Sequence, residues 1–519
     1  MNNFDVWLRW KAALPLLALL GLVAFALLHG GAFIYSSDVI DMAQAARCLL
    51  ERGEFCSRFL PLPLADSAML AAPVWPLFHR FPALPAIYAA LSRLLGLDLS
   101  GYAPLIIASL LGYGAYAWGV ARLCLNLLPP GGALLGTAWA LLHPLMLREA
   151  FTGDTTTWDA ASLCWGACLA LEGKALRWGL VAAGFFLIRH NALVWMAPTL
   201  FLARSWKSFI PRAAVAFFCG ASPWLFRNTL VGGRPFISET GEMMRAVFPG
   251  RPYPWFVLAP SPLTAQEFWY KCAFNLRMMA SGVPRTLGGA SSWIAAVPAI
   301  LLWVGGATIL RGGRIVAVVG KVRHAVPLLA VGLILHHVML LPLDYVPRYS
   351  RVAIPFAALV LGLLFSMRGR RQVTLGMALV ALTFLLNIAQ WSWGPAKSEV
   401  NDFAFHAREL QQPLSDGSAL ADRLKDVDVC VSTQPGNVAL QLPCRALPLP
   451  VLPAQWATLA RRLHDAGVKK VAVLLFTPRQ NWSAYEALPP ATGGYELRAQ
   501  WSGTTSRGRP LELVDFVLP

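Results

Sequence analysis

Charged side chains are scarce in this sequence. Only 14% of its 519 residues are Asp, Glu, Lys or Arg, whereas 56% are hydrophobic. Soluble domains carry roughly 25% charged residues. The deficit argues against a soluble protein and predicts a mainly α-helical chain that crosses a membrane several times.

Sequence features that would indicate a particular fold or site are also missing. The sequence has no glycine-rich phosphate-binding loop, no internal repeat and no zinc-type spacing among its nine cysteines. Cys430 and Cys444 lie in a polar C-terminal region. If that region is outside the cytoplasm, a disulfide and two buried thiols are equally compatible with the sequence.

The charges that are present are mostly basic. Lys and Arg total 44 and Asp and Glu total 27, which gives a net charge of +17. In a membrane protein this excess is expected in the cytoplasmic loops. It therefore indicates topology and gives no reason to expect a nucleic-acid partner.

Long apolar runs predict eleven membrane-spanning helices. The first, from Ala13 to about Tyr35, follows Arg9 and Lys11 and lacks a convincing cleavage site, so we expect a retained helix with a cytoplasmic N-terminus. Ten more runs fit spans, at residues 104–126, 131–148, 156–172, 176–189, 191–204, 212–227, 292–310, 325–342, 352–367 and 372–390.

The distribution of basic residues supports this topology. Every predicted short cytoplasmic loop is basic, as the positive-inside rule requires. These loops contain Lys174, Arg177, Arg204, Lys207, Arg212, Arg311, Arg314, Lys321, Arg323, Arg368, Arg370 and Arg371. An odd number of spans then leaves the C-terminal end outside the cytoplasm.

We therefore predict two domains. Residues 1–391 form a transmembrane domain with outside loops at 36–103 and 228–291, and the first loop carries an interfacial helix at 83–97. Residues 392–519 form a small periplasmic α/β domain. Its expected elements are strands at 427–432, 470–476 and 511–518 and a helix at 453–466.

Polar side chains gather in three of the predicted outside segments. Asp38 and Asp41 begin an amphipathic helix over residues 39–52, directly after the first span. Asp154 lies in the turn after the third span, and Arg348 and Arg351 lie between the ninth and tenth spans. Because all three segments face the same side of the membrane, we expect them to form one site.

These residue types suit the transfer of a sugar. A carboxylate such as Asp38 can take a proton from an acceptor hydroxyl. The planar guanidinium groups of Arg348 and Arg351 match the oxygens of a departing phosphate. This chemistry requires no cofactor. A divalent metal ion held by Asp38 and Asp154 would be compatible with it, although two carboxylates are weak support for such an ion.

Each candidate also has a structural interpretation. For Asp38 and for Asp154, capping a helix fits the sequence as well as a functional role does. Asp41 fits a structural role better, because a carboxylate is favoured at the positive end of its helix. Arg351 fits an interfacial anchor better than a ligand, whereas Arg348 fits a ligand slightly better. Arg189 and Arg227 fit the ends of their helices, and the intramembrane pair at 336–337 fits a hydrogen-bonded structural role.

The ordered motifs resemble the GT-C class of integral-membrane glycosyltransferases. The chain is similar to the bacterial branch that includes the aminoarabinose transferases of lipid A and the protein O-mannosyltransferases. The matching pieces cover about residues 10–390. They are Asp38 followed by Ala46, Leu49 or Leu50 and Gly53; His143-Pro144 followed by Asp154; Leu187-Ile188-Arg189; Pro223-Trp224-Leu225-Phe226-Arg227-Asn228; and Tyr345-Val346-Pro347-Arg348-Tyr349 followed by Pro355.

The resemblance implies roles for these positions. Asp38 matches the catalytic base of the family, and Asp154 matches an acidic residue that helps hold the acceptor or a metal. Arg348 matches a position near the donor phosphate. Val39 follows Asp38 where many members have a second acidic residue or glycine, so the choice between Asp38 and Asp41 stays open, with Asp38 favoured. The candidate substrate-binding residues are Asp154, Arg348, Asp41, Tyr345, Arg351 and Arg227.

The prediction is a bacterial inner-membrane glycosyltransferase. It implies an undecaprenyl phosphate sugar as donor, contact with membrane lipids, and a glycan, lipid or protein as acceptor on the periplasmic side. The alternative is a transporter or flippase of lipid-linked saccharides. That alternative is weaker because the spans contain few charges and the sequence shows no related halves.

Overall fold

The computed structural model describes most of the chain. The described residues are 21–23, 37–76, 81–235, 245–249, 251, 254–288, 300, 304, 319–343, 347–366, 370–393, 413–415, 418–450, 452, 454–476, 495–504 and 510–518. The predicted spans at 13–35 and 292–310 lie almost entirely outside these residues.

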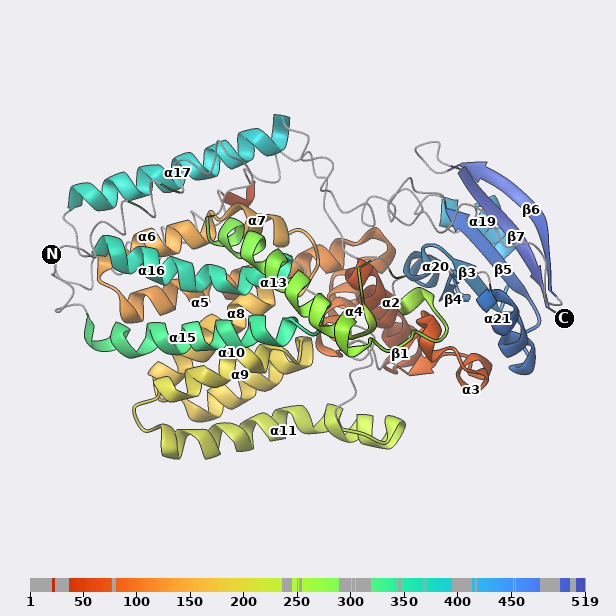
Figure 1. Ribbon diagram of the computed structural model, residues 1–519, viewed down its shortest axis with the longest axis horizontal. Helices are drawn as coiled ribbons and strands as arrows, with labels where there is room; N and C mark the ends of the chain where they lie inside the picture. The colour runs from red at the N-terminus through yellow and green to blue at the C-terminus, as the bar shows by residue number, and fades with distance from the viewer. Residues whose placement is uncertain are drawn as a thin grey trace.

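A bundle of helices occupies one end of the molecule and a sheet domain the other, with α2 and α4 at the junction (Figure 1). The helices of the bundle and the junction are α2 (Ser37–Arg52), α4 (Ala83–Leu95), α5 (Ala103–Leu127), α6 (Pro130–Leu141), α7 (Pro144–Glu149), α8 (Thr156–Leu171), α9 (Ala175–Ile188), α10 (Ala192–Met196), η3 (Ala197–Leu202), α11 (Trp206–Gly232), α13 (Ala265–Gly288), α15 (Val319–Leu340), η7 (Pro347–Ala353), α16 (Ile354–Ser366) and α17 (Arg370–Trp393).

Most predicted spans correspond to one of these helices, but some boundaries differ. The span predicted at 131–148 is broken between α6 and α7, where Pro144 restricts His143 to an extended conformation. Within the described residues, α5 and α11 are long and apolar enough to cross a membrane, and six further apolar helices are shorter. The total of eleven spans therefore stays a prediction.

One long helix corrects an expectation from the sequence. Residues 228–291 were predicted as an outside loop in which no helix was named, yet the second half of this region contains the 24-residue helix α13. Tyr349 of η7 packs against the buried cluster of Met279 and Leu340, which joins this helix to η7 and α15. Asn275 also donates its Nδ2–H to the carbonyl of Leu341, directly after α15, at 2.9 Å.

Large apolar side chains cover the outward faces of the long helices. Trp118 on α5, Leu230 on α11 and Ile334 on α15 are 66%, 70% and 61% exposed. Among the described residues of the sheet domain, the exposed large apolar side chains are Leu452 and Val517, at only 40% and 38%. Exposed apolar surface of this extent marks a membrane or protein contact, so the helices suit lipid and the sheet domain suits water.

Glycine allows the helices of the bundle to approach closely. A Cβ atom on Gly136 of α6 would lie 2.4 Å from the Ala358 carbonyl oxygen of α16, and one on Gly362 would lie 2.5 Å from the Gly132 oxygen. Small residues at such contacts are typical of helices that pack within a membrane.

The sheet domain is a mixed five-stranded sheet in the order β4-β3-β5-β7-β6. The strands are β3 (Val429–Ser432), β4 (Arg445–Pro448), β5 (Val471–Phe476), β6 (Glu496–Thr504) and β7 (Pro510–Val517), and the helices are α19 (Ala419–Leu424), α20 (Pro435–Gln441) and α21 (Ala454–Asp465). The pairings of β3 with β4 and with β5 are parallel, whereas β7 pairs antiparallel with β5 and with β6. The expected α/β elements are present, while β4, β6, α19 and α20 were not predicted. The boundary at 391–392 is untested.

The first outside loop adds to this sheet. Phe59 of the loop forms a parallel bridge with Ala446 of β4, and the Leu60 amide donates to the Ala446 carbonyl at 3.2 Å. The loop contains the short strands β1 (Cys56–Ser57) and β2 (Trp75–Pro76), the 3-10 turn η1 (Leu62–Leu64) and the helix α3 (Ser67–Ala71). The sheet domain is thus fastened to the segment that follows α2.

The cysteines resolve the question that the sequence leaves open. Cys430 and Cys444 are buried free thiols, and burial raises the pKa of Cys444 to about 12. Instead, a disulfide joins Cys48 near the end of α2 to Cys56 of β1. This pair, which closes the loop directly after α2, was not predicted from the sequence.

We predict that Gly136→Ala destabilises the protein by about 1–3 kcal/mol, because the added methyl group forces the backbones of α6 and α16 apart. Gly184→Ala is the matched control, since a methyl group at that position on α9 would have nothing within 4 Å. The readout is the melting temperature of each variant in detergent. Equal melting temperatures for the two variants would contradict this close contact.

Candidate active site

A buried turn between α7 and α8 is the centre of the candidate site. Gly153 has a φ of +76°, which favours glycine, and a Cβ there would lie 2.9 Å from Val39 Cγ1 of α2. The Tyr88 hydroxyl donates to the Gly153 carbonyl at 2.5 Å. The turn that carries Asp154 is therefore packed against the first turn of α2, which carries Asp38.

The two carboxylates of α2 differ in their surroundings. Asp41 is 2% exposed and accepts a hydrogen bond from Gln44 Nε2 at 3.2 Å. Gln44 in turn accepts from the Arg58 amide at 2.8 Å, so this network fixes the loop after the helix. Asp38 lies in the first turn and is only partly buried. Of the two, Asp38 is the more accessible to a substrate.

Asp154 is buried beside the start of α8. Its Oδ1 accepts from the Thr155 amide at 2.6 Å, so the carboxylate is partly engaged by its own neighbour. Within the described residues, no three His, Cys, Asp or Glu side chains are grouped as a metal ion requires. The divalent ion at Asp38 and Asp154 therefore stays a prediction.

An ion pair connects this turn to the distant segment η7. The Arg351 guanidinium contacts the Glu149 carboxylate, and both side chains are at least nine-tenths buried. Burial, and secondarily the nearby Arg148, lowers the pKa of Arg351 well below its ordinary value. The sequence suggested that Arg351 is an interfacial anchor that reaches lipid headgroups. Its burial in this pair does not fit that interpretation.

The other residues predicted on this segment are only partly placed. The backbone of Arg348 belongs to η7, three residues before Arg351. Its side chain and the whole of Tyr345 lie outside the described part of the chain. The predicted contact of Arg348 with a phosphate therefore stays a prediction.

Arg189 ends α9, as the sequence suggested, and its side chain also contacts two other elements. Its guanidinium donates to Asp159 Oδ2 at 2.9 Å and to Thr155 Oγ1 at 3.1 Å. It also lies over the ring of Tyr349, 4.7 Å from the centroid. Arg189 thus joins the end of α9 to both α8 and η7. The signal was present in the sequence as the acidic Asp159, one helical turn after Thr155.

His190, the residue after Arg189, has a largely buried imidazole. Burial, with a smaller contribution from Arg189, lowers the pKa of His190 to about 4. The ring of Phe81 lies 5.0 Å from that imidazole, centroid to centroid.

Arg227 contacts a different part of the molecule. It donates to the Phe55 carbonyl at 3.0 Å and lies over Trp224, 4.8 Å from the ring centroid. These contacts fasten α11 to the loop that follows α2. The described contacts of Arg227 therefore support a structural role more directly than the predicted substrate contact.

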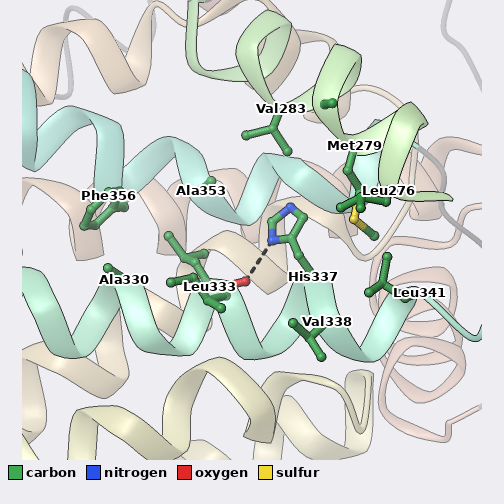
Figure 2. A pocket seen from close by; sticks show the side chains of 12 residues that line it. Leu276, Met279, Val283, Ala330, Leu333, His337, Val338, Leu341, Ala353 and Phe356 are labelled. Atoms are coloured by element: carbon green, nitrogen blue, oxygen red, sulfur yellow. Dashed lines mark hydrogen bonds between the residues drawn. The ribbon is translucent and has the colours of Figure 1, made fainter. Parts of the chain in front are cut away.

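A largely apolar groove of about 520 Å³ lies between α13, α15 and α16 (Figure 2). It is lined by Leu276, Met279, Ala280, Val283, Ala330, Leu333, Ile334, His337, Val338, Leu341, Ala353 and Phe356. The groove was not predicted from the sequence, because α13 was not. The helical spacing of positions 276, 279, 280 and 283 was the available signal.

We predict that Glu149→Gln lowers the free energy of unfolding by about 3–5 kcal/mol, because it leaves the buried Arg351 without its carboxylate. Glu496→Gln breaks the exposed pair with Arg498 and should leave stability unchanged. Chemical denaturation of both variants tests this. A Glu149→Gln variant as stable as the control would show that the buried pair is not required.

Comparisons with known proteins agree with this architecture. No family model and no curated protein matches the sequence. The fold is similar to ArnT from Cupriavidus metallidurans bound to undecaprenyl phosphate, with a TM-score of 0.53, 13% identity and coverage of 97% of this chain and 98% of that chain. It is also similar to the apo oligosaccharyltransferase of Archaeoglobus fulgidus, with a TM-score of 0.52, 12% identity and coverage of 89% and 69%. The chain therefore has the GT-C fold, which confirms the resemblance read from its motifs.

Proposed function

We propose that this protein is a membrane glycosyltransferase that transfers a sugar from a polyprenyl phosphate, undecaprenyl phosphate in a bacterium, to an acceptor at the periplasmic face. The observation that carries the proposal is the contact of three segments at one buried turn. Val39 beside Asp38 packs on Gly153 beside Asp154, and Arg351 of η7 pairs with Glu149.

The fold supports the class of reaction. ArnT and the archaeal oligosaccharyltransferase are glycosyltransferases of the GT-C class, and the ArnT structure contains undecaprenyl phosphate. The archaeal enzyme has also been solved with a tethered acceptor peptide, in a structure similar to this chain with a TM-score of 0.50 and 12% identity. A donor attached to a lipid and a separate acceptor are the expected substrates of this arrangement.

The groove supports a lipid donor. Its lining is apolar apart from His337, which suits an isoprenoid chain better than a free nucleotide sugar. The groove borders Ala353, the last residue of η7. An isoprenoid chain held in the groove would therefore place its phosphate toward η7, the segment that carries Arg348 and Arg351.

The chemistry follows from the residues at the turn. Asp38 takes the proton from the acceptor hydroxyl while the acceptor oxygen bonds to the anomeric carbon. The bond between that carbon and the phosphate oxygen breaks at the same time. Arg348 binds the phosphate that leaves, with Arg351 behind it, and Asp154 orients the acceptor. Protonated Asp38 and the lipid phosphate are the products besides the glycosylated acceptor.

The disulfide supports a periplasmic site. Disulfides persist in oxidising compartments, and Cys48–Cys56 closes the loop directly after the helix that carries Asp38. Together with the basic cytoplasmic loops, this favours an inner-membrane protein whose site and sheet domain face the periplasm.

A transporter of lipid-linked saccharides remains the alternative class. It would move the same donor without forming a covalent bond to an acceptor. The carboxylate and guanidinium groups collected at one turn favour the transferase, because transport alone does not require a base. Covalent transfer of a labelled sugar in proteoliposomes separates the two functions.

We predict that Asp38→Asn lowers kcat for sugar transfer from the lipid phosphate by at least about 100-fold, because the amide cannot accept the proton. Asp41→Asn should cost less, since Asp41 is buried and bonded to Gln44. The matched control is Asp66→Asn in the same loop, where the side chain only caps α3 and Asn caps equally well. Unchanged turnover in Asp38→Asn would remove the proposed mechanism.

We predict that Ala330→Phe raises KM for the lipid donor by about tenfold with little change in kcat, because the ring fills the groove and removes binding that ground and transition states share. Val331→Phe, on the exposed side of the same helix, is the control. Steady-state kinetics over a range of donor concentrations tests this. Equal KM values for both variants would exclude the groove as the donor site.

A further inference from the structure

Two adjacent imidazoles on α15 bond to the arginine segment η7. His336 Nε2 lies 3.1 Å from the Tyr349 carbonyl oxygen, and His337 Nε2 lies 3.0 Å from Ser350 Oγ. His337 Nδ1 is also 2.8 Å from the Leu333 carbonyl oxygen. Polar side chains inside an apolar helix are costly unless they serve a purpose, and both of these side chains have the same neighbour.

The partners determine the direction of each hydrogen bond. A carbonyl can only accept, so His336 donates from Nε2 and His337 donates from Nδ1. In a neutral ring, His337 Nε2 is then an acceptor, and the Ser350 hydroxyl donates to it. The two rings are therefore opposite tautomers, each one set by its own bond.

The pair is supported from behind. The ring of Trp195 lies 4.5 Å from that of His336 at a steep angle, and its Nε1 donates to Ser162 Oγ at 2.6 Å. This contact fixes the plane of His336 against α8 and α10. The rings are therefore held in place and do not merely fill space.

The bonded residues of η7 lie between its two arginines. Tyr349 and Ser350 follow Arg348 and precede Arg351, and Ser350 is fully buried. The ring of His337 also lines the apolar groove, where it points into the space between α13 and α15 (Figure 2). One imidazole therefore contacts both the groove and the segment that carries the arginines.

We propose that His336 and His337 are positioning residues that hold η7 so that Arg348 of this segment meets the phosphate of a lipid in the groove. This inference rests on the proposed function, because it takes the groove as the donor site. The imidazoles do not touch the reacting atoms. They set the affinity for the phosphate group, whereas the apolar lining sets the affinity for the isoprenoid chain.

The test measures binding of two lipids to the purified full-length protein in nanodiscs. Undecaprenyl phosphate and undecaprenol share the chain and differ in the phosphate. For Ser350→Ala and for His337→Leu, we expect Kd for undecaprenyl phosphate to rise by about tenfold, the worth of one hydrogen bond. Ser350→Ala should leave Kd for undecaprenol unchanged because Ser350 does not line the groove, and His337→Leu, which makes the lining more apolar, should not raise it. The double variant should cost no more than either single one, because both remove the same bond.

Two further variants separate positioning from general damage. Ile334→Ala alters the groove lining without touching a hydrogen bond, so it should weaken both lipids equally. His336→Leu should weaken only the phosphate, and His336→Gln should restore binding because its amide N–H can donate to the Tyr349 carbonyl.

The possible outcomes are distinguishable. If Ser350→Ala and His337→Leu weaken both lipids equally, or neither, the positioning role is wrong while the donor groove stands. If the wild-type protein binds undecaprenol as tightly as undecaprenyl phosphate, the proposed function fails and this inference fails with it.

Discussion

The buried ion pair between Glu149 and Arg351 is the constraint on which the rest of the structure depends. Separating two buried charges leaves each without a partner in a poor solvent, so the turn after α7 and the segment η7 must stay together. The same turn packs on α2 through Gly153, where a side chain would collide with Val39. Residues of α2, of the turn at 149–154 and of η7 (347–353), which are far apart in the sequence, therefore meet at one place.

This polar cluster lies among three features: the apolar bundle, the sheet domain and the groove. The bundle presents apolar side chains outward, whereas the sheet domain is fastened beside the turn by the loop that follows α2. The helix α2, on which this turn packs, lies at the junction between the bundle and the sheet domain (Figure 1). An apolar groove ends at the same segment η7. A lipid-linked donor and a water-soluble or membrane-bound acceptor can approach such a site from different sides.

Hydrophobic runs and periodicity predicted much of the fold, because the hydrophobicity of a segment and the spacing of its apolar residues can be read from the local sequence. They located α5, α8 and α9, the helix after Asp38, and the main strands of the sheet domain. They failed for α13, whose aromatic and basic residues resemble an interfacial loop. They did not predict the contacts of Arg189 with Asp159 and Tyr349, the Cys48–Cys56 disulfide or the pairing of Glu149 with Arg351, because these contacts depend on tertiary packing that a single sequence does not display.

The central claim is that the lipid phosphate of the donor binds beside the arginine segment η7, next to the turn that follows α7. A cryo-electron microscopy structure of the protein with undecaprenyl phosphate tests it most directly. The account predicts isoprenoid density along the groove between α13, α15 and α16, with the phosphate beside η7 and facing Asp38. Density for the lipid on another face of the bundle, with the groove empty, would contradict it.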